Sequence, residues 1–296
     1  MNRQHEISVG VIGGSGVYEL SGVKVIEEIA IDTPFGSPSD RIVIASTSGG
    51  KVAFLPRHGK GHRLLPSEVP SKANIWALKS LGVRQIIGVS AVGSLKEEIR
   101  PTDIVLPSQI IDRTKGRPST YFGNGIVGHV SFADPFCEDL RAEISGYIAE
   151  YLASNHPGKR LFTDETYVCM EGPQFSTRAE SELHRSWGAG VIGMTAVPES
   201  KLAREAEICY AMIALPTDYD CWREGEAAVD VSQIVANMEE NNRTVNLLLP
   251  YILERLSGKC SRGCSEAAKF AVMTRPDVIP AETKDRLSLF YGKYLG

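Results

Sequence analysis

The chain has 296 residues, of which 43% are hydrophobic and 23% are charged, so it can bury a full core and is not expected to be disordered. Its net charge of -4 does not favour a partner such as DNA, although a local basic pocket is compatible with it. The N-terminal residues lack the apolar region of a signal peptide, and no stretch approaches the ~20 apolar residues of a membrane span. We therefore expect a soluble, cytoplasmic protein.

The predicted elements alternate between strands and helices along most of the chain. β-branched and apolar runs predict strands, and apolar residues at helical spacing predict helices. The predicted strands cover residues 7–12, 42–45, 52–56, 85–89, 103–106, a segment that ends near 169, 191–192 and 211–216. The predicted helices cover residues 72–81, 138–152, 177–187, a segment after Pro198 and residues 231–256. This alternation predicts one α/β domain with a mixed, largely parallel central sheet flanked by helices.

The last part of the chain differs from the rest. After Gly258 the sequence becomes more polar and carries cysteines. This change predicts a main domain over residues 1–258 and a C-terminal extension over residues 259–296. The extension is expected to pack on the same domain or on a neighbouring subunit.

Six cysteines are spread along the chain without the paired C-x-x-C spacing that is typical of zinc sites. Most are expected to be small buried hydrophobic residues, and the sequence predicts no metal. Cys260 and Cys264 lie close together in C-S-R-G-C. A disulfide and two free thiols are both compatible with that spacing, and a reducing cytosol favours the thiols.

Small, hydroxylic or cationic residues that can bind an anion follow four predicted strands. They are Gly13–Gly16, Arg57–His58, Ser90–Ser94 and, ahead of a predicted helix, Thr195. Backbone N–H groups and helix N-termini attract phosphate, and the arginine fork suits it. Each segment also has an interpretation without a ligand. The first can be a tight turn and the second a solvated basic loop, while the third can be a Gly-Ser turn and Thr195 a helix cap.

The glycine turn at 13–16 does not match the common nucleotide motifs. Reading G-x-G-x-x-G from Gly14 puts Glu19 at the third glycine, which disfavours an NAD-dependent oxidoreductase. The sequence G-K-[ST] of a P-loop is also missing from this turn.

Two acids follow the strand predicted at 211–216. In T-D-Y-D-C-W, Asp218 and Asp220 lie at the carboxyl end of that strand, the edge where ligands bind in open α/β sheets. Two acids two residues apart can form hydrogen bonds with two polar atoms of one planar ligand. The alternative is that both acids belong to a solvated loop and bind no ligand. Phe175 lies in the loop M-E-G-P-Q-F-S and has two interpretations. Its ring can stack on a planar base, or it can be a core residue at the start of the following helix. With cations and hydroxyls at the other strand ends, the acids predict a ligand with an anion at one side and a donor-rich ring at the other.

Longer stretches of the chain are similar to the trimeric nucleoside phosphorylases. The matching stretches are G-G-S-G at 13–16, D-T-P-F-G at 32–36, R-H-G at 57–59, A-N-I-W-A-L at 73–78, G-S-L-K-E-E-I at 93–99, D-P-F-C at 134–137, E-G-P-Q-F-S-T-R-A-E at 171–180, M-T-A-V-P-E at 194–199 and T-D-Y-D-C-W at 217–222. They occur in the order of the family, whereas residues 115–127 and those after Gly258 do not align with it. The resemblance implies a nucleoside phosphorylase-like fold and a homotrimer, with inorganic phosphate as co-substrate and neither a metal nor a cofactor.

The resemblance also implies roles for individual residues. Phosphate-site positions are matched by Ser15, Arg57, His58, Ser90, Ala91 and Thr195. Base and ribose positions are matched by Phe175, Ser176, Met194, Asp218 and Asp220. The pocket for a 5′-alkylthio group is matched by Val231, Ile234 and, from a neighbouring subunit, His129.

The activity that the resemblance implies is a pentosyl transfer: phosphorolysis of S-methyl-5′-thioadenosine to adenine and 5-methylthioribose 1-phosphate, a step of purine and methionine salvage. Adenine leaves poorly as an anion, so a protonated Asp218 would serve as the general acid at purine N7, and burial beside Asp220 favours that proton. An ionised Asp220 would accept a hydrogen bond from the exocyclic amine and reject a 6-oxo group. The alternatives are a 6-oxopurine nucleoside phosphorylase and a non-catalytic nucleoside-binding protein.

Overall fold

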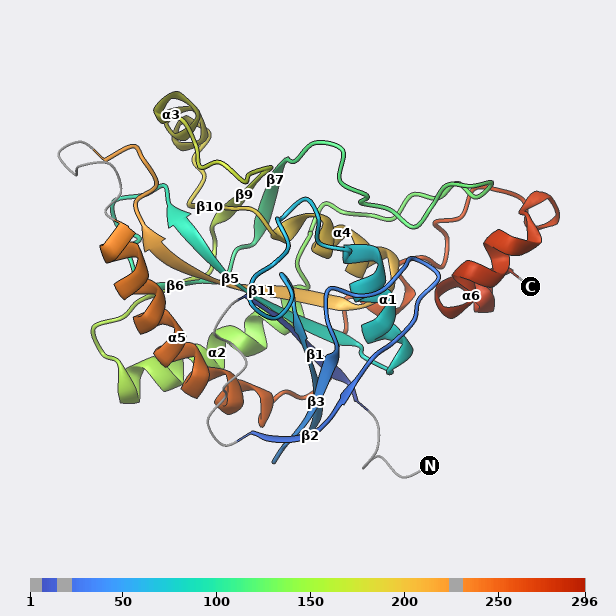
Figure 1. Ribbon diagram of the computed structural model, residues 1–296, viewed down its shortest axis with the longest axis horizontal. Coiled ribbons are helices and arrows are strands. Elements are labelled where there is room, and N and C mark those ends of the chain that lie inside the picture. The colour runs from blue at the N-terminus through green and yellow to red at the C-terminus, as the bar shows by residue number, and fades with distance from the viewer. Residues whose placement is uncertain (1–6, 15–22, 224–230, 296) are drawn as a thin grey trace.

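A sheet of eleven strands forms the centre of the protein in the computed structural model, which describes residues 7–14, 23–223 and 231–295. The strands are β1 (Val9–Gly13), β2 (Lys24–Ile29), β3 (Ile42–Thr47), β4 (Gly50–Pro56), β5 (Gln85–Ser94), β6 (Ile104–Val105), β7 (Gln109–Arg113), β8 (Leu161–Phe162), β9 (Thr166–Met170), β10 (Val191–Gly193) and β11 (Cys209–Asp218). The helices are α1 (Ser71–Ser80), α2 (Glu138–Asn155), α3 (Arg178–Ser186), α4 (Ala196–Glu205), α5 (Val231–Leu253) and α6 (Ala281–Leu295), with short 3₁₀ helices η2 (Cys264–Glu266) and η3 (Pro276–Val278). Helices cover both faces of the sheet (Figure 1).

The sheet is mixed, and β5 is its branch point. The strand order is β2-β3-β4-β1-β5-β10-β9-β7, while β11 pairs with β5 and β6, and β6 also pairs with β8. β5 is parallel to β1 and β11 but antiparallel to β10. The fold class predicted from the sequence, α/β with a mixed and largely parallel sheet, is confirmed.

A gap between two pairings on one side of β5 creates room for a site. β1 pairs with residues 85–88 of β5, and β10 pairs with residues 93 and 94, so residues 89–92 lie between the two neighbours. Because β10 runs opposite to β1, the carboxyl ends of both strands point toward this gap. In open α/β sheets, ligands bind where neighbouring connections diverge in this way.

The two faces of β11 pack into two different hydrophobic cores. Tyr210 and Met212 pack with the α1 and α4 side of the sheet, whereas Ala211 and Ile213 pack with α2 and α5 on the other side. The alternation follows from the period of two along a strand, and burial on both faces explains why the run reads as continuously apolar. β11 is therefore a central strand with a fixed position.

The observed elements also correct several sequence-based boundaries. β5 continues to Ser94, because β11 pairs with it as far as Gly93, so Ser90 to Ser94 belong to a strand and not to a turn after one. The strand expected at 103–106 shortens to β6. The sequence interpretation missed β2, β7 and α6. Within the described ranges, no helix is both long enough and apolar enough to cross a membrane.

The C-terminal extension contacts the same chain in two places. Cys264 belongs to the core beneath α2 and α5. Further along, the rings of Tyr291 in α6 and Phe122 stack with their centroids 5.2 Å apart, and Phe290 contacts Tyr121 at 4.5 Å. Together, α6 and the long connection before α2 form an arm that projects from the body of the protein (Figure 1).

Candidate active site

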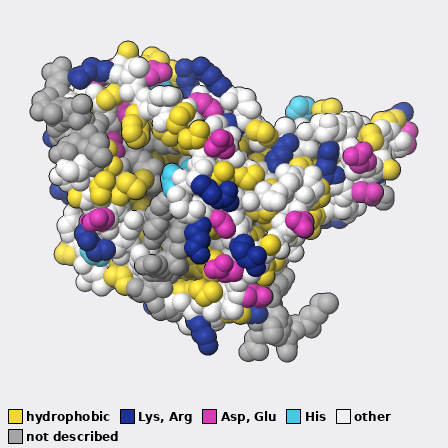
Figure 2. Space-filling model, viewed as in Figure 1, with side chains coloured by type: hydrophobic (Ala, Val, Ile, Leu, Met, Phe, Trp, Pro, Cys, Tyr) yellow, Lys and Arg dark blue, Asp and Glu magenta, His cyan; other side chains and the backbone are white. Residues whose placement is uncertain are grey.

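A cavity of about 430 Å³ lies in the gap beside residues 89–92 of β5, a size that suits a small-molecule ligand. Its walls come from the loop after β4, the middle of β5, the ends of β9, β10 and β11, and the first turns of α5. On the face shown in Figure 2, hydrophobic side chains gather around the hollow and a histidine lies at its edge. Ten residues singled out from the sequence line the cavity: Arg57, His58, Ser90, Ala91, Phe175, Met194, Thr195, Asp218, Asp220 and Ile234.

Arg57 is buried at one end of the cavity and held by a dense hydrogen-bond network. Its Nε donates to Oε1 of Glu199 at 2.5 Å, and Nη2 donates to Oε2 of the same carboxylate at 3.1 Å. Nη1 donates to the carbonyl of Val89 and Nη2 to that of Ile12. The guanidinium is thus fixed between β1 and β5, and Glu199 offsets part of its charge.

His58 follows Arg57 and is a neutral group in this site. Burial, with the positive charge of Arg57, lowers the pKa of His58 to about 4. Nδ1 lies 2.9 Å from the carbonyl oxygen of Leu64, and because a carbonyl only accepts, Nδ1 carries the ring proton. Nε2 is then an acceptor. The His58 ring stacks on His62, with centroids 4.4 Å apart.

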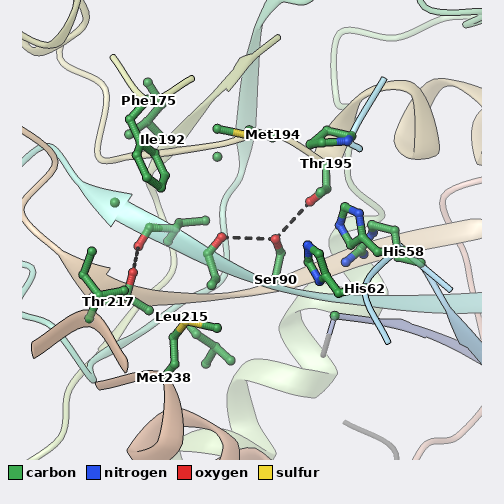
Figure 3. Close-up of a pocket in the computed structure, with 18 of the residues that line it drawn as sticks. His58, His62, Ser90, Phe175, Ile192, Met194, Thr195, Leu215, Thr217 and Met238 are labelled. Atoms are coloured by element: carbon green, nitrogen blue, oxygen red, sulfur yellow. Dashed lines mark hydrogen bonds between the residues drawn. The ribbon is translucent and has the colours of Figure 1, made fainter. Parts of the chain in front are cut away.

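Two hydroxyls lie together at the same end of the cavity. Thr195 Oγ1 donates to Ser90 Oγ at 3.0 Å, and Ser90 Oγ donates to the Ala91 carbonyl at 3.1 Å (Figure 3). A residue at a helix start, such as Thr195, can offer an anion its backbone N–H as well as its hydroxyl. The N–H of Thr195, however, donates to the buried hydroxyl of Tyr167. Thr195 can therefore offer an anion its hydroxyl but not its backbone N–H.

A β-bulge positions Asp218 at the opposite end. Pro216 is opposite Val92 and Asp218 is opposite Gly93, so Thr217 is an extra residue on β11. The Thr217 hydroxyl donates to Asp218 Oδ2 at 2.6 Å, and the backbone N–H of Asp220 donates to Oδ1 at 2.8 Å. Bulges commonly re-aim side chains next to active sites. Here the bulge and two donors fix the plane of the carboxyl group.

Gly93 is required where β5 passes beneath the acids. A Cβ atom at this position would lie 3.1 Å from Asp218 Oδ1 and 3.4 Å from Asp220 Cβ. The first of these contacts is tighter than an ordinary van der Waals contact, so a side chain here would shift the Asp218 carboxyl by a few tenths of an ångström. The glycine lets the two strands approach closely at the acid end.

Asp220 has an unusual backbone and an unsatisfied oxygen. Its φ of 51° lies in the left-handed region, which non-glycine residues seldom adopt and which is common at functional sites. Its Oδ2 is buried and has no hydrogen-bond partner among the described residues. A buried carboxylate oxygen of this kind is a strong acceptor that suits a donor from a ligand.

The wall next to the acids is apolar. Phe175 is 77% exposed, and it lies with Ile192 and Met194 on one side of the cavity (Figure 3). Ser176 is not a lining residue, and its hydroxyl faces the sulfur of Met170 at 3.9 Å. An exposed aromatic ring at a cavity mouth suits the flat face of a heterocycle.

Three other residues from the sequence analysis stand apart. Ser15 lies outside the described residues, and Val231 is described only as the first residue of α5. Ile234, one turn further along α5, lines the cavity. His129 is exposed in the arm and does not line the cavity of its own chain.

Several residues that shape the site were missed from the sequence. Arg117, from a stretch that does not align with the family, is buried and donates to Glu171 Oε2 at 3.1 Å and to the Met194 carbonyl at 2.6 Å. It thereby connects the Phe175 loop with the Met194 wall. Glu199, the partner of Arg57, occurs in the sequence only as the last residue of the matching stretch M-T-A-V-P-E. Its role depends on a contact with a residue 142 positions away, which only the fold reveals.

The architecture and the layout of this cavity define the class of protein. The chain belongs to the Phosphorylase superfamily, whose sequence profile matches residues 8–253, so the family resemblance predicted from the sequence is confirmed. It is similar to the S-methyl-5′-thioadenosine phosphorylase of Geobacter sulfurreducens, with 51% identity over 288 residues that cover 97% of this chain and 99% of the relative.

Solved structures agree with the sequence relatives. A methylthioadenosine phosphorylase sourced from an antarctic soil metagenomic library has a TM-score of 0.89 and 45% identity, covering 97% of this chain and 99% of that chain. A mutant adenosine/methylthioadenosine phosphorylase from Schistosoma mansoni, in complex with methylthioadenosine, has a TM-score of 0.81 and 35% identity over 89% of this chain and 96% of that chain.

Proposed function

We propose that this chain catalyses the phosphorolysis of S-methyl-5′-thioadenosine to adenine and 5-methylthioribose 1-phosphate. The observation that carries the proposal is one cavity with Arg57, His58 and two hydroxyls at one end and an aspartate pair at the other. The names of the similar proteins, which share about half of their residues with this chain over nearly its full length, support the same substrate.

The acid end suits adenine. The unsatisfied Oδ2 of Asp220 can accept from the exocyclic amine at purine C6, whereas a 6-oxo group would present lone pairs to it. Asp218, held by Thr217 and by the Asp220 backbone, can lie beside N7 and donate a proton there. The exposed ring of Phe175 can stack on the base.

The opposite end suits phosphate. Arg57 and Arg63 bring positive charge, and the hydroxyls of Ser90 and Thr195 can donate to phosphate oxygens. Neutral His58 offers an acceptor at Nε2, which matches the hydroxyl that phosphate itself carries near neutral pH. The arginines stay charged, so they bind and orient phosphate without transferring protons.

The reaction then needs no further group from the protein. A phosphate oxygen forms a bond to C1′ of the sugar while the C1′–N9 bond breaks and its electron pair moves into the purine. The proton from Asp218 reaches N7, so adenine leaves as a neutral base. The bound phosphate dianion also stabilises the positive charge that develops on the sugar.

The 5′ group extends toward α5. Ile234 and Met238 line this part of the cavity and offer an apolar surface for a methylthio group. We also propose a cytoplasmic homotrimer in which His129 of one subunit reaches the 5′ pocket of the next. The exposure of His129, away from the cavity of its own chain, is compatible with that role.

The decisive experiment measures base release from three nucleosides with and without inorganic phosphate. We expect adenine from S-methyl-5′-thioadenosine only when phosphate is present, slower release from adenosine, and almost none from inosine. Preferred release of hypoxanthine from inosine would replace this proposal with a 6-oxopurine phosphorylase. Ligand-induced thermal stabilisation without any base release would indicate a non-catalytic nucleoside-binding protein.

A further inference from the structure

Four of the six cysteines, from three separate parts of the sequence, meet at one point on the α2 and α5 side of the sheet. The sulfur atoms of Cys137, Cys209, Cys260 and Cys264 all lie within 4.8 Å of one another. None of the four is in a disulfide, and three of them are buried. The sequence has no C-x-x-C pair that would reveal this group, and only the fold brings the four thiols together.

We propose that this four-cysteine cluster binds one structural Zn²⁺ ion. The sulfurs of Cys137 and Cys260 are 3.8 Å apart. A regular tetrahedron with Zn–S bonds of about 2.3 Å has edges of about 3.8 Å, so this pair has the separation that a Zn–S₄ centre requires, and the separations of the other sulfurs exceed it by no more than about 1 Å. Four thiolates in tetrahedral reach are the ligand set of zinc or of iron, and zinc binds them without any redox chemistry.

The protein around the cluster favours thiolates. Cys137 precedes the first turn of α2, where the helix dipole stabilises negative charge. A divalent cation would displace the remaining thiol protons to solvent and take their place between the sulfurs.

The backbone presents the four ligands from rigid positions. The N–H of Cys137 donates to the Tyr210 carbonyl at 2.8 Å, so the start of α2 is tied to the start of β11, where Cys209 lies. The other two cysteines come from the extension. There, Ser261 donates from its N–H and its hydroxyl to the carboxylate of Asp139, and Gly263 turns the chain with a φ of 72° directly before Cys264.

The ion would connect the extension to the main domain and would have no part in the reaction. Cys137 caps the start of α2 and Cys209 begins β11, whereas the other two ligands follow α5, so coordination joins the segments on either side of Gly258. A site with four protein ligands leaves no open position for a substrate, which is the pattern of structural zinc. Cys209 and Asp218 are nine residues apart along β11, or about 30 Å, so the cluster lies far from the acid end of the cavity.

The test is the zinc content of the full-length protein, purified in reducing buffer from cells grown with zinc, and measured by mass spectrometry of the elements. We expect about one zinc per chain, as a single closed site requires. Cys260→Ser, at the least buried ligand, should lose most of the metal. Cys169→Ser is the matched control, because Cys169 is a cysteine outside the cluster, and it should keep the metal.

Cobalt gives a second readout that does not depend on how well the variants fold. Wild-type protein that is stripped of metal and loaded with Co²⁺ should show the intense absorption of tetrahedral cobalt thiolate. Absence of stoichiometric zinc together with no such absorption would overturn the proposal. Two disulfides within the cluster, found by mass spectrometry of the protein from a reducing cytoplasm, would also overturn it, as would iron in place of zinc.

Discussion

The two ends of the cavity are built in opposite ways. At the phosphate end, Arg57 is buried, and it donates four hydrogen bonds to Glu199 and to two backbone carbonyls. At the base end, Phe175 is 77% exposed and Asp220 keeps a buried oxygen without a partner among the described residues. One end is prearranged and internally satisfied, whereas the other leaves its polar and aromatic groups for the ligand.

The contrast assigns different tasks to the two ends. Phosphate is small and always the same, so a fixed set of groups can bind it at little cost in ordering. The base must be told apart from close relatives, and an acceptor that only the correct ligand satisfies provides that discrimination. Substitutions at the phosphate end should therefore damage stability as well as binding, and those at the base end should change selectivity.

The largest effect is expected from Asp218→Asn. The amide keeps the shape of the carboxyl group but cannot deliver the proton to N7, so kcat/KM for S-methyl-5′-thioadenosine should fall by about 10²–10⁴. Relative activity on inosine should rise, because an amide N–H can serve a 6-oxopurine better. Steady-state kinetics with both nucleosides measure the change, and unaltered constants for both would remove Asp218 from the mechanism.

Arg57→Ala should affect both stability and phosphate. Loss of the guanidinium leaves Glu199 charged, buried and unpaired, which typically costs about 3–5 kcal/mol of unfolding free energy. The KM for phosphate should rise steeply. The double variant Arg57→Met with Glu199→Met is the control: it should recover stability in denaturant unfolding without recovering phosphate affinity. Recovery of both would mean that Arg57 acts only through the fold.

Asp220→Ala tests the selectivity of the base end. Removal of the acceptor for the amine should lower kcat/KM for the adenine nucleoside by about 10–100-fold, which corresponds to the usual strength of a hydrogen bond to a charged group. The value for inosine should change little or rise, so the ratio of the two constants is the readout. An equal decrease of kcat/KM for both substrates would argue against a hydrogen bond between Asp220 and the exocyclic amine.

Phe175→Ala should weaken nucleoside binding without an effect on phosphate. Stacking of a base on an aromatic side chain is worth about 1–3 kcal/mol, so the nucleoside KM should rise while the phosphate KM stays constant. Because the side chain is mostly exposed in the single chain, the melting temperature of the variant should match that of the wild type. A lower melting temperature would show that Phe175 serves packing instead.

The last expected effect is a pH dependence of stability from His58, which leaves activity near neutral pH unchanged. The unfolded chain binds a proton at this residue below about pH 6.5, whereas the folded site, where the pKa is about 4, binds it only at lower pH. Between these values the unfolded state binds more protons, so stability falls as pH decreases from 6.5 to 4. His58→Gln should flatten this part of the melting-temperature profile in phosphate-free buffer, and an unchanged slope would count against burial of a neutral ring.

The sequence was most informative where a strand is buried on both faces. The apolar runs that became β1, β4 and β11 were recognised because continuous β-branched and apolar residues have few other interpretations. β2 was missed because Lys24–Ile29 is mostly exposed and mixes charged with apolar residues. α6 lies in a segment that had been read as a polar extension, although four of its aromatic and aliphatic side chains are buried.

The site was predictable as a set of strand ends but not as a network. Local patterns indicated Asp218 and Thr195, since each lies near a recognisable strand end. The Arg57–Glu199 pair and the contacts of Arg117 join residues far apart in sequence, and only the fold brings them together. The same holds for the four-cysteine cluster, because Cys137 and Cys209 are far in sequence from each other and from the Cys260 and Cys264 pair.

The branch at β5 also sets the distance between the two chemical events. Ser90, at the phosphate end, and Gly93, opposite Asp218, are separated by three residues of one extended strand, or about 10 Å. The attacking oxygen and the departing base must both fit within that interval. An inserted or deleted residue in this part of β5 would change the interval by a full strand step and would turn the side chains beyond it to the opposite face of the sheet, so the two ends could no longer act on one pair of substrates.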